Sequence, residues 1–148
     1  MIRKFKGICG GQTSSNKKFD GWVYGEGVFT RGINNVYLNH KLAMIEVIED
    51  TVCQYIGVED SDGNEIYEND IVEYAIPQRS EMGDVITRTY NRGVVFFNYE
   101  TLAFYLLVTQ NGKTFICSFA DLLKGGFTLK VIGNKFDELT RYSEKPNN

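Results

Sequence analysis

Short apolar runs alternate with polar turns along most of the chain. The runs 93–98 (GVVFFN) and 102–108 (LAFYLLV) are good examples, because both are short and rich in β-branched and aromatic residues. Such runs favour strands over helices. Asn111-Gly112, between two apolar runs, predicts a hairpin with a type I′ turn. The pattern therefore predicts a mainly β protein, built as a barrel or a sandwich.

Two places in this pattern favour a helical turn. Glu49-Asp50-Thr51 follows an apolar run, and Asp50 is a suitable N-terminal cap. Residues 119–124 follow Ser118, another capping residue, and precede Gly125-Gly126, which suits the end of a helix. We therefore expect one or two short helical turns within the β framework.

The stretch 54–74 (QYIGVEDSDGNEIYENDIVEY) contains two tight polar turns around the short apolar pair Ile66-Tyr67. In the first turn, Asx side chains can bond their own backbone and Gly accepts a positive φ. We expect the apolar run before this turn to break at Gly57, and the strand after the second turn to end at Pro77. Two sharp turns followed by a strand are typical of the corner of a small β-barrel.

This stretch resembles the YopX family of phage and prophage proteins, whose recurring text runs roughly G-x-x-D-x-x-G-x-x-I-Y-E-G-D-I-V. Asn69 stands where the family usually has Gly, a mild departure because Asn also tolerates a left-handed backbone. A second block at 131–134 (VIGN) and a looser match at 22–25 extend the resemblance over about residues 2–139. The signature residues in the two blocks are Gly57, Asp60, Gly63, Ile66, Tyr67, Glu68, Asp70, Ile71, Val72, Ile132, Gly133 and Asn134.

The resemblance implies a mostly β protein with an SH3-like barrel and a tendency to form homo-oligomers, and it implies no reaction. We expect the SH3-like small barrel in the C-terminal half, over residues 54–139. An N-terminal β lobe is expected over 1–53, and a polar, disordered tail over 140–148. The signature residues are expected to be structural.

Acidic residues occupy the region 46–73 without any Lys or Arg between them. The acids that begin at Asp60 have the spacing of the first EF-hand ligands. The sixth and twelfth positions, however, hold Glu65 and Ile71 in place of Gly and Glu, so the calcium motif fails. A solvated turn is the preferred interpretation, and a weak cation site or a basic partner stays open. For Asp70, hydrogen bonds to the amides of its own turn are favoured over a catalytic role.

Few groups remain for catalysis or for a cofactor. His40 is the sole histidine, and its neighbours are typical of an exposed turn. The three cysteines lie far apart, which fits buried thiols in a reducing compartment better than a zinc site. Gly25-x-Gly27 lacks the rest of a dinucleotide fingerprint. We therefore expect no enzymatic activity, no catalytic residue, no cofactor, no metal and no small-molecule substrate.

The formal net charge of −3 argues against a general nucleic-acid coat, yet the first 18 residues carry only basic charges. We expect Arg3, Lys4 and Lys6 to face solvent. Three roles stay open for the basic residues: a solvated face, a contact with the acidic region of another subunit, or nucleic-acid binding beside exposed aromatic rings. The candidate nucleic-acid contacts are Arg3, Lys4, Lys6, Lys17 and Lys18, with Trp22, Tyr24, Tyr90 and Phe104 as candidate stacking rings.

No apolar run approaches the length of about 20 residues that spans a bilayer, so we expect no membrane association and a cytoplasmic location in a bacterial host. The preferred hypothesis is a non-enzymatic phage or prophage accessory protein that acts as a β-rich homo-oligomer. Exposed strand edges and an excess of aromatic residues favour burial between subunits. The alternative is a nucleic-acid-binding module that uses the basic N-terminal stretch.

Overall fold

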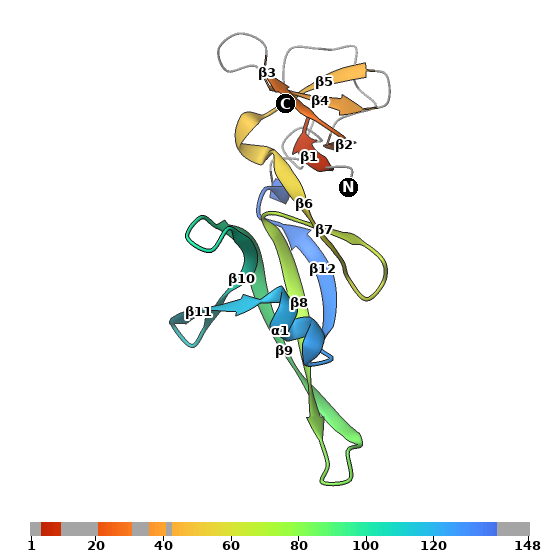
Figure 1. Cartoon of the computed structure of the whole chain (residues 1–148), viewed down its shortest axis with the longest axis vertical. Coiled ribbons are helices and arrows are strands. Elements are labelled where there is room, and N and C mark those ends of the chain that lie inside the picture. The colour runs from red at the N-terminus through yellow and green to blue at the C-terminus, as the bar shows by residue number, and fades with distance from the viewer. Residues whose placement is uncertain (1–3, 10–20, 31–35, 41–42, 139–148) are drawn as a thin grey trace, which may run out of the picture. The chain divides into compact units, whose positions relative to one another are not determined.

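A computed structural model describes residues 4–9, 21–30, 36–40 and 43–138 (Figure 1). The chain divides into two compact units. One unit consists of Met1–Tyr55 with Phe136–Asn148, and the other consists of Ile56–Lys135. Strands dominate the described residues of both units, which confirms the prediction of a mainly β protein. The expected tail at 140–148 lies outside the described residues.

A curled antiparallel sheet of five strands forms the framework of the unit Ile56–Lys135 (Figure 1). Its order is β11-β10-β9-β8-β12, so most strands pair with their neighbours in the sequence. The short helix α1 (Phe119–Lys124) leads from β11 to β12. The SH3-like barrel expected for this unit stays a prediction. The strands are β8 (Asp70–Arg79), β9 (Val85–Asn98), β10 (Ala103–Gln110), β11 (Lys113–Ser118) and β12 (Thr128–Asn134).

One face of this sheet carries the core of the unit. Val72 and Tyr74 on β8 are buried, whereas Ile71 and Glu73 beside them are only half-buried, as the two-residue period of a strand requires. The strand β7 (Glu65–Tyr67) and helix α1 add further apolar side chains to the same core. The core consists of Ile66, Val72, Tyr74, Val95, Leu106, Val108, Phe119, Leu122 and Leu129.

Local sequence explains how this unit turns. Asn111 and Gly112 have φ of 53° and 74°, which confirms the predicted type I′ geometry between β10 and β11. The Ser118 hydroxyl accepts a hydrogen bond of 3.2 Å from the Asp121 N–H, so Ser118 caps α1 as predicted. Gly126, with φ of 70°, follows the end of the helix.

The other unit contains two small antiparallel sheets. One contains β2 and β1 with the start of β6, and the second has the order β3-β4-β5. Val36, Leu38 and Val47 form a buried cluster that Phe5 and Val52 cover. The elements are β1 (Phe5–Ile8), β2 (Trp22–Gly25), β3 (Val28–Thr30), β4 (Val36–His40), β5 (Ala43–Val47), the 3-10 turn η2 (Glu49–Thr51) and β6 (Cys53–Glu59).

Three local predictions are wrong. Gly57 does not break the apolar run, because it lies inside β6 with a φ of 86° that only glycine adopts easily. Pro77 does not end β8, which continues to Arg79. In the described residues β12 pairs with β8 only as far as Ala75, so the missing N–H of Pro77 breaks no ladder there. The predicted helical turn η2 is present, but Asp50 does not cap it.

Candidate functional site

The two signature blocks, about 70 residues apart in the sequence, meet at the turn between β6 and β7. The Asp60 carboxylate accepts hydrogen bonds from the N–H groups of Asp62 (3.0 Å) and Asn64 (2.8 Å), and from the Asn64 side-chain amide (3.3 Å). It also accepts one from the Val131 N–H on β12 (3.0 Å). One carboxylate therefore shapes its own turn and holds a distant strand.

Ser61 adds a second connection between the same turn and β12. Its N–H donates to the Leu129 carbonyl (2.9 Å), and its hydroxyl accepts from the Leu129 N–H (3.1 Å). Ser61 and Asp60 thus extend the hydrogen bonding of β12 beyond its pairing with β8. We call Asp60, Ser61 and their hydrogen bonds to β12 the clasp.

A second buried carboxylate organises the turn before β8. Asp70 is fully buried and accepts hydrogen bonds from the Tyr67 N–H (2.8 Å) and from the side-chain amide of Asn134 on β12 (2.9 Å). The first bond confirms that Asp70 bonds an amide of its own turn. Asn69 has a φ of 66°, as its place in the signature predicts, and its backbone bonds Val95 and Lys135.

The electrostatics of the clasp favour a charged Asp60. Burial by itself raises the pKa of this carboxyl group, but the hydrogen bonds from Val131, Asn64 and Asp62 outweigh it, so the pKa lies below its usual value. Asp60 is therefore ionised at neutral pH and saturated with donors. A carboxylate in this state is a structural acceptor, with little capacity left for acid–base chemistry.

The other signature residues have structural positions as well. Ile66, Tyr67 and Val72 are buried, and Gly63 has a φ of 84° in the first turn. Ile71 is half-buried on β8. On β12, the pairing with β8 shifts register between Val131 and Gly133, and Ile132 at this irregularity is exposed. Glu68 offers its carbonyl to the Asn134 amide at 3.4 Å.

One predicted surface contact is wrong. Lys6 was expected to face solvent as a nucleic-acid contact, but it is only 6% exposed and its ammonium lies 4.6 Å from the centre of the Trp22 ring. The indole N–H of Trp22 donates to Asp137 (2.8 Å), which holds the ring in place. Burial of the long lysine stem against an aromatic ring explains why a basic strand residue points inwards.

The remaining basic candidates divide into two groups. Lys4 is exposed, as predicted, and its ammonium lies 5.6 Å from the centre of the Tyr55 ring. Arg3, Lys17 and Lys18 lie outside the described residues. Of the candidate stacking rings, Tyr24 and Tyr90 are exposed, whereas Trp22 and Phe104 are half-buried.

No metal centre is formed within the described ranges. These residues contain no group of three or more His, Cys, Asp or Glu side chains placed to hold a metal ion. The side chain of His40 is outside the described part. Burial raises the pKa of Tyr74, and the Cys117 thiol beside its hydroxyl (3.9 Å) raises it further, so Tyr74 stays neutral. None of the described helices combines the length and apolar character needed to cross a membrane.

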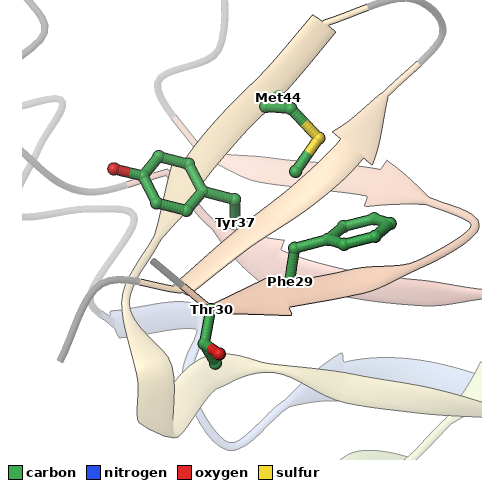
Figure 2. A pocket seen from close by; sticks show the side chains of 4 residues that line it. All are labelled: Phe29, Thr30, Tyr37 and Met44. Carbon is green, nitrogen blue, oxygen red and sulfur yellow. The ribbon is translucent and has the colours of Figure 1, made fainter. Parts of the chain in front are cut away.

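The sequence analysis missed an apolar hollow of about 210 Å³ on the β3-β4-β5 sheet, lined by Phe29, Thr30, Tyr37 and Met44 (Figure 2). Phe29 lies directly opposite Tyr37 in the ladder, so their side chains share one face of the sheet. Phe29 is 49% and Met44 is 48% exposed, whereas the core residues of β4 and β5 lie on the other face. The sequence did contain a signal for this exposed apolar face, because apolar residues occupy consecutive positions in these strands. A sheet with one buried and one solvated face usually alternates apolar and polar residues.

A second missed feature is the arm, which we define as residues 76–92. It contains the end of β8 beyond its pairing with β12, and the part of β9 that precedes its pairing with β10. Figure 1 shows this hairpin extending beyond the other strands of its unit. Residues 81–90 are all exposed, including Ile86 at 71% and Tyr90 at 60%. The sequence VITRTY is rich in β-branched residues and favours a strand, but its pattern does not indicate that the strand would be completely exposed.

Comparison with known proteins identifies a family for the chain. The chain matches the family model of the YopX protein over residues 17–139, which is most of its length. No curated protein and no solved structure matches the chain. The matched range includes both signature blocks, whose residues form the clasp and the buried Asp70 turn. The chain therefore belongs to the YopX protein family.

Proposed function

We propose that this protein is a non-enzymatic accessory protein of a phage or prophage, and that it acts in the bacterial cytoplasm as a β-rich homo-oligomer with a structural or interaction role. The observation that carries the proposal is the arm, a two-stranded ribbon that exposes apolar side chains and strand edges. A two-stranded ribbon is marginally stable by itself in water. Partners that cover such ribbons stabilise them, and large exposed apolar patches mark interaction sites.

The apolar hollow gives independent support for an interaction role. Phe29 and Met44 leave about half of their surfaces in contact with water on the outer face of a sheet. Exposed apolar area disfavours the isolated molecule by about 25 cal/mol for each Å² that a partner would otherwise cover. The non-enzymatic part of the proposal is supported by the two signature carboxylates, whose acceptor capacity is used by Tyr67, Asn134 and the clasp donors.

The test is light scattering on a size-exclusion column, with the nucleic-acid and protein absorbances recorded across the peak. We expect a mass that is a multiple of the 16.9 kDa subunit, with a protein-like absorbance ratio. A monomer at every concentration that the column can resolve would overturn the homo-oligomer.

A nucleic-acid-binding module is the second candidate. The exposed Lys4 and Tyr24 support it, although burial of Lys6 removes one expected contact. Binding through phosphate contacts weakens steeply as salt rises. A peak with a high nucleic-acid absorbance that falls to the protein value in concentrated salt would favour this candidate over the oligomer.

A further inference from the structure

Along residues 85–92, the outer edge of β9 is not covered by any described strand. Between residues 85 and 92, β9 pairs with β8 on one side, and its pairing with β10 on the other side begins only at Gly93. The backbone groups that point outwards along this edge have no strand partner among the described residues. An edge of this kind is a template for pairing with another chain.

The other edge of the arm is protected. Beyond Ala75, β8 contains Pro77, which has no N–H to donate to a neighbouring strand. The pairing of β9 with β8 has an irregularity at Ile86, but it is regular from Thr87 to Arg92, where no proline or glycine interrupts the strand. The sequence VITRTYNR is also rich in β-branched residues. Because of this difference between the two edges, a strand of another chain would pair with the β9 edge and not with the β8 edge.

The charges on this edge disfavour nucleic acid as the occupant. Arg92 forms an ion pair with Glu73 (3.3 Å), and Arg79 on the neighbouring strand donates to the Gly83 carbonyl (3.1 Å). Arg88 is the one basic residue of the arm for which neither kind of bond is present in the described structure. Neutralisation of several phosphates needs more cations than this.

We propose that the β9 edge of the arm pairs antiparallel with the same edge of a second copy, with Thr89 on the two-fold axis. This inference rests on the proposed homo-oligomer and names its contact surface. Two identical edges related by a two-fold axis form an isologous interface, in which each residue faces a fixed partner. Parallel, in-register pairing would instead place each arginine opposite its own copy.

The arginines select the register among the antiparallel alternatives. An axis at Arg88 would place two Arg88 side chains opposite each other, and an axis at Tyr90 would place Arg88 opposite Arg92. Like charges directly opposite each other destabilise a sheet. An axis at Thr89 places Arg88 opposite the Tyr90 ring of the second copy, where a cation–π contact forms.

The same register also uses the whole edge. With the axis at Thr89, the paired residues run from Ile86 to Arg92. An axis at Thr87 would leave Tyr90, Asn91 and Arg92 beyond the paired segment. Arg88 and Tyr90 lie on one face of the strand because they are two residues apart. The exposed Tyr90 is then covered by the arginine of the second copy in each half of the interface.

Disulfide trapping in the full chain tests this register. With Thr89 on the axis, the two Thr89 Cα atoms face each other at the roughly 4.5–5.5 Å of a directly opposed pair, which lies within the range of a disulfide. We expect Thr89→Cys to give a covalent dimer under mild oxidation. Thr87→Cys is the matched control: its two copies would lie about four residues apart along the strand, roughly 14 Å, and should not cross-link above the wild-type background.

A charge exchange tests the same contact without oxidation. Tyr90→Lys places a lysine opposite Arg88 of the second copy, so we expect at least a tenfold higher dissociation constant of the oligomer. Arg88→Glu combined with Tyr90→Lys restores opposite charges, and we expect most of the affinity to return. Both side chains are exposed, so circular dichroism of the variants should match the wild type.

The outcomes separate this inference from the proposed function. A monomeric wild-type protein overturns both. An oligomeric wild type in which Thr89→Cys does not cross-link, or in which Thr87→Cys cross-links instead, overturns only the arm interface. So does an oligomer that Phe29→Ser in the hollow dissociates while Tyr90→Lys leaves it intact. If Tyr90→Lys removes bound nucleic acid and leaves the mass unchanged, the arm is a nucleic-acid contact and the inference is wrong.

Discussion

Asp60→Ala removes the acceptor that connects the first signature turn to β12. The substitution leaves four donors without the carboxylate: the N–H groups of Asp62, Asn64 and Val131, and the Asn64 side-chain amide. It creates almost no cavity in the hydrophobic core, because Asp60 is not a member of that cluster. The loss of stability in Asp60→Ala therefore measures the contribution of the hydrogen bonds to the charged Asp60 carboxylate.

The expected loss is about 3 kcal/mol. A hydrogen bond to a charged acceptor contributes roughly 1.5–3 kcal/mol. Asp62 and Asn64 lie in an exposed turn, so water replaces the carboxylate there and those donors lose little. The Val131 N–H lies on a half-buried strand, and its bond makes the largest contribution. The full contribution of the Val131 bond and partial contributions of the three bonds from Asp62 and Asn64 add up to the expected loss of about 3 kcal/mol.

The pH dependence has a definite sign. The pKa of Asp60 is lower in the folded protein than in the unfolded chain, so the folded state favours the carboxylate. The stabilisation is complete above the unfolded value of about 3.9, and is lost as the pH falls through the lowered folded pKa. The difference between wild type and Asp60→Ala should therefore be constant near neutral pH and should shrink in strong acid.

Urea unfolding followed by far-ultraviolet circular dichroism is the assay. The sole tryptophan, Trp22, lies in the other unit, so its fluorescence does not report on the clasp. With a slope of roughly 1–2 kcal/mol per molar, the midpoint should fall by roughly 1.5–3 M urea. Asp62→Ala removes the same charge from an exposed side chain of the same turn and should change stability by less than about 0.5 kcal/mol. Equal losses of unfolding free energy in the two variants, or no loss in Asp60→Ala, would refute the conclusion that the clasp stabilises the fold.

Three further substitutions test other parts of the same unit. Tyr67→Ala should destabilise the fold by about 3 kcal/mol or more, because it leaves a cavity at a buried ring, and an unchanged melting temperature would contradict the burial. Asn69→Gly should be neutral or slightly stabilising in thermal melts, because φ is 66° there, and a clear loss would mean that the amide makes a needed bond. Tyr74→Phe should reduce the loss of stability at alkaline pH, since the raised pKa of Tyr74 gives stability that is complete below about pH 10 and is lost as the pH rises through the folded value. Parallel melting curves of wild type and variant at about pH 9 and pH 11 check the last prediction.

Features that depend on neighbouring residues were predictable. The positive φ of Asn69 and of Asn111-Gly112, the Ser118 cap and the Asp70 bond to its own turn all involve groups within four residues of each other. Their geometry follows from local sterics and from the reach of a short side chain. Two of the three failures at this scale, at Gly57 and Pro77, occurred where a strand tolerates a residue that usually interrupts it.

The sequence by itself determined the β character of this protein, its principal turns and its membership of the YopX family. Strand periodicity and turn preferences depend on residues that are close together in the sequence, so they can be recognised without the fold. Tertiary structure alone decided that Asp60 and Asp70 reach β12, that Lys6 packs beneath Trp22, and that the arm exposes one edge of β9. These depend on which strands lie side by side, and pairing over about 70 residues is set by packing of the whole core. The same signature carboxylates that resemble a candidate site in the sequence are, in the fold, the acceptors that hold the last strand in place.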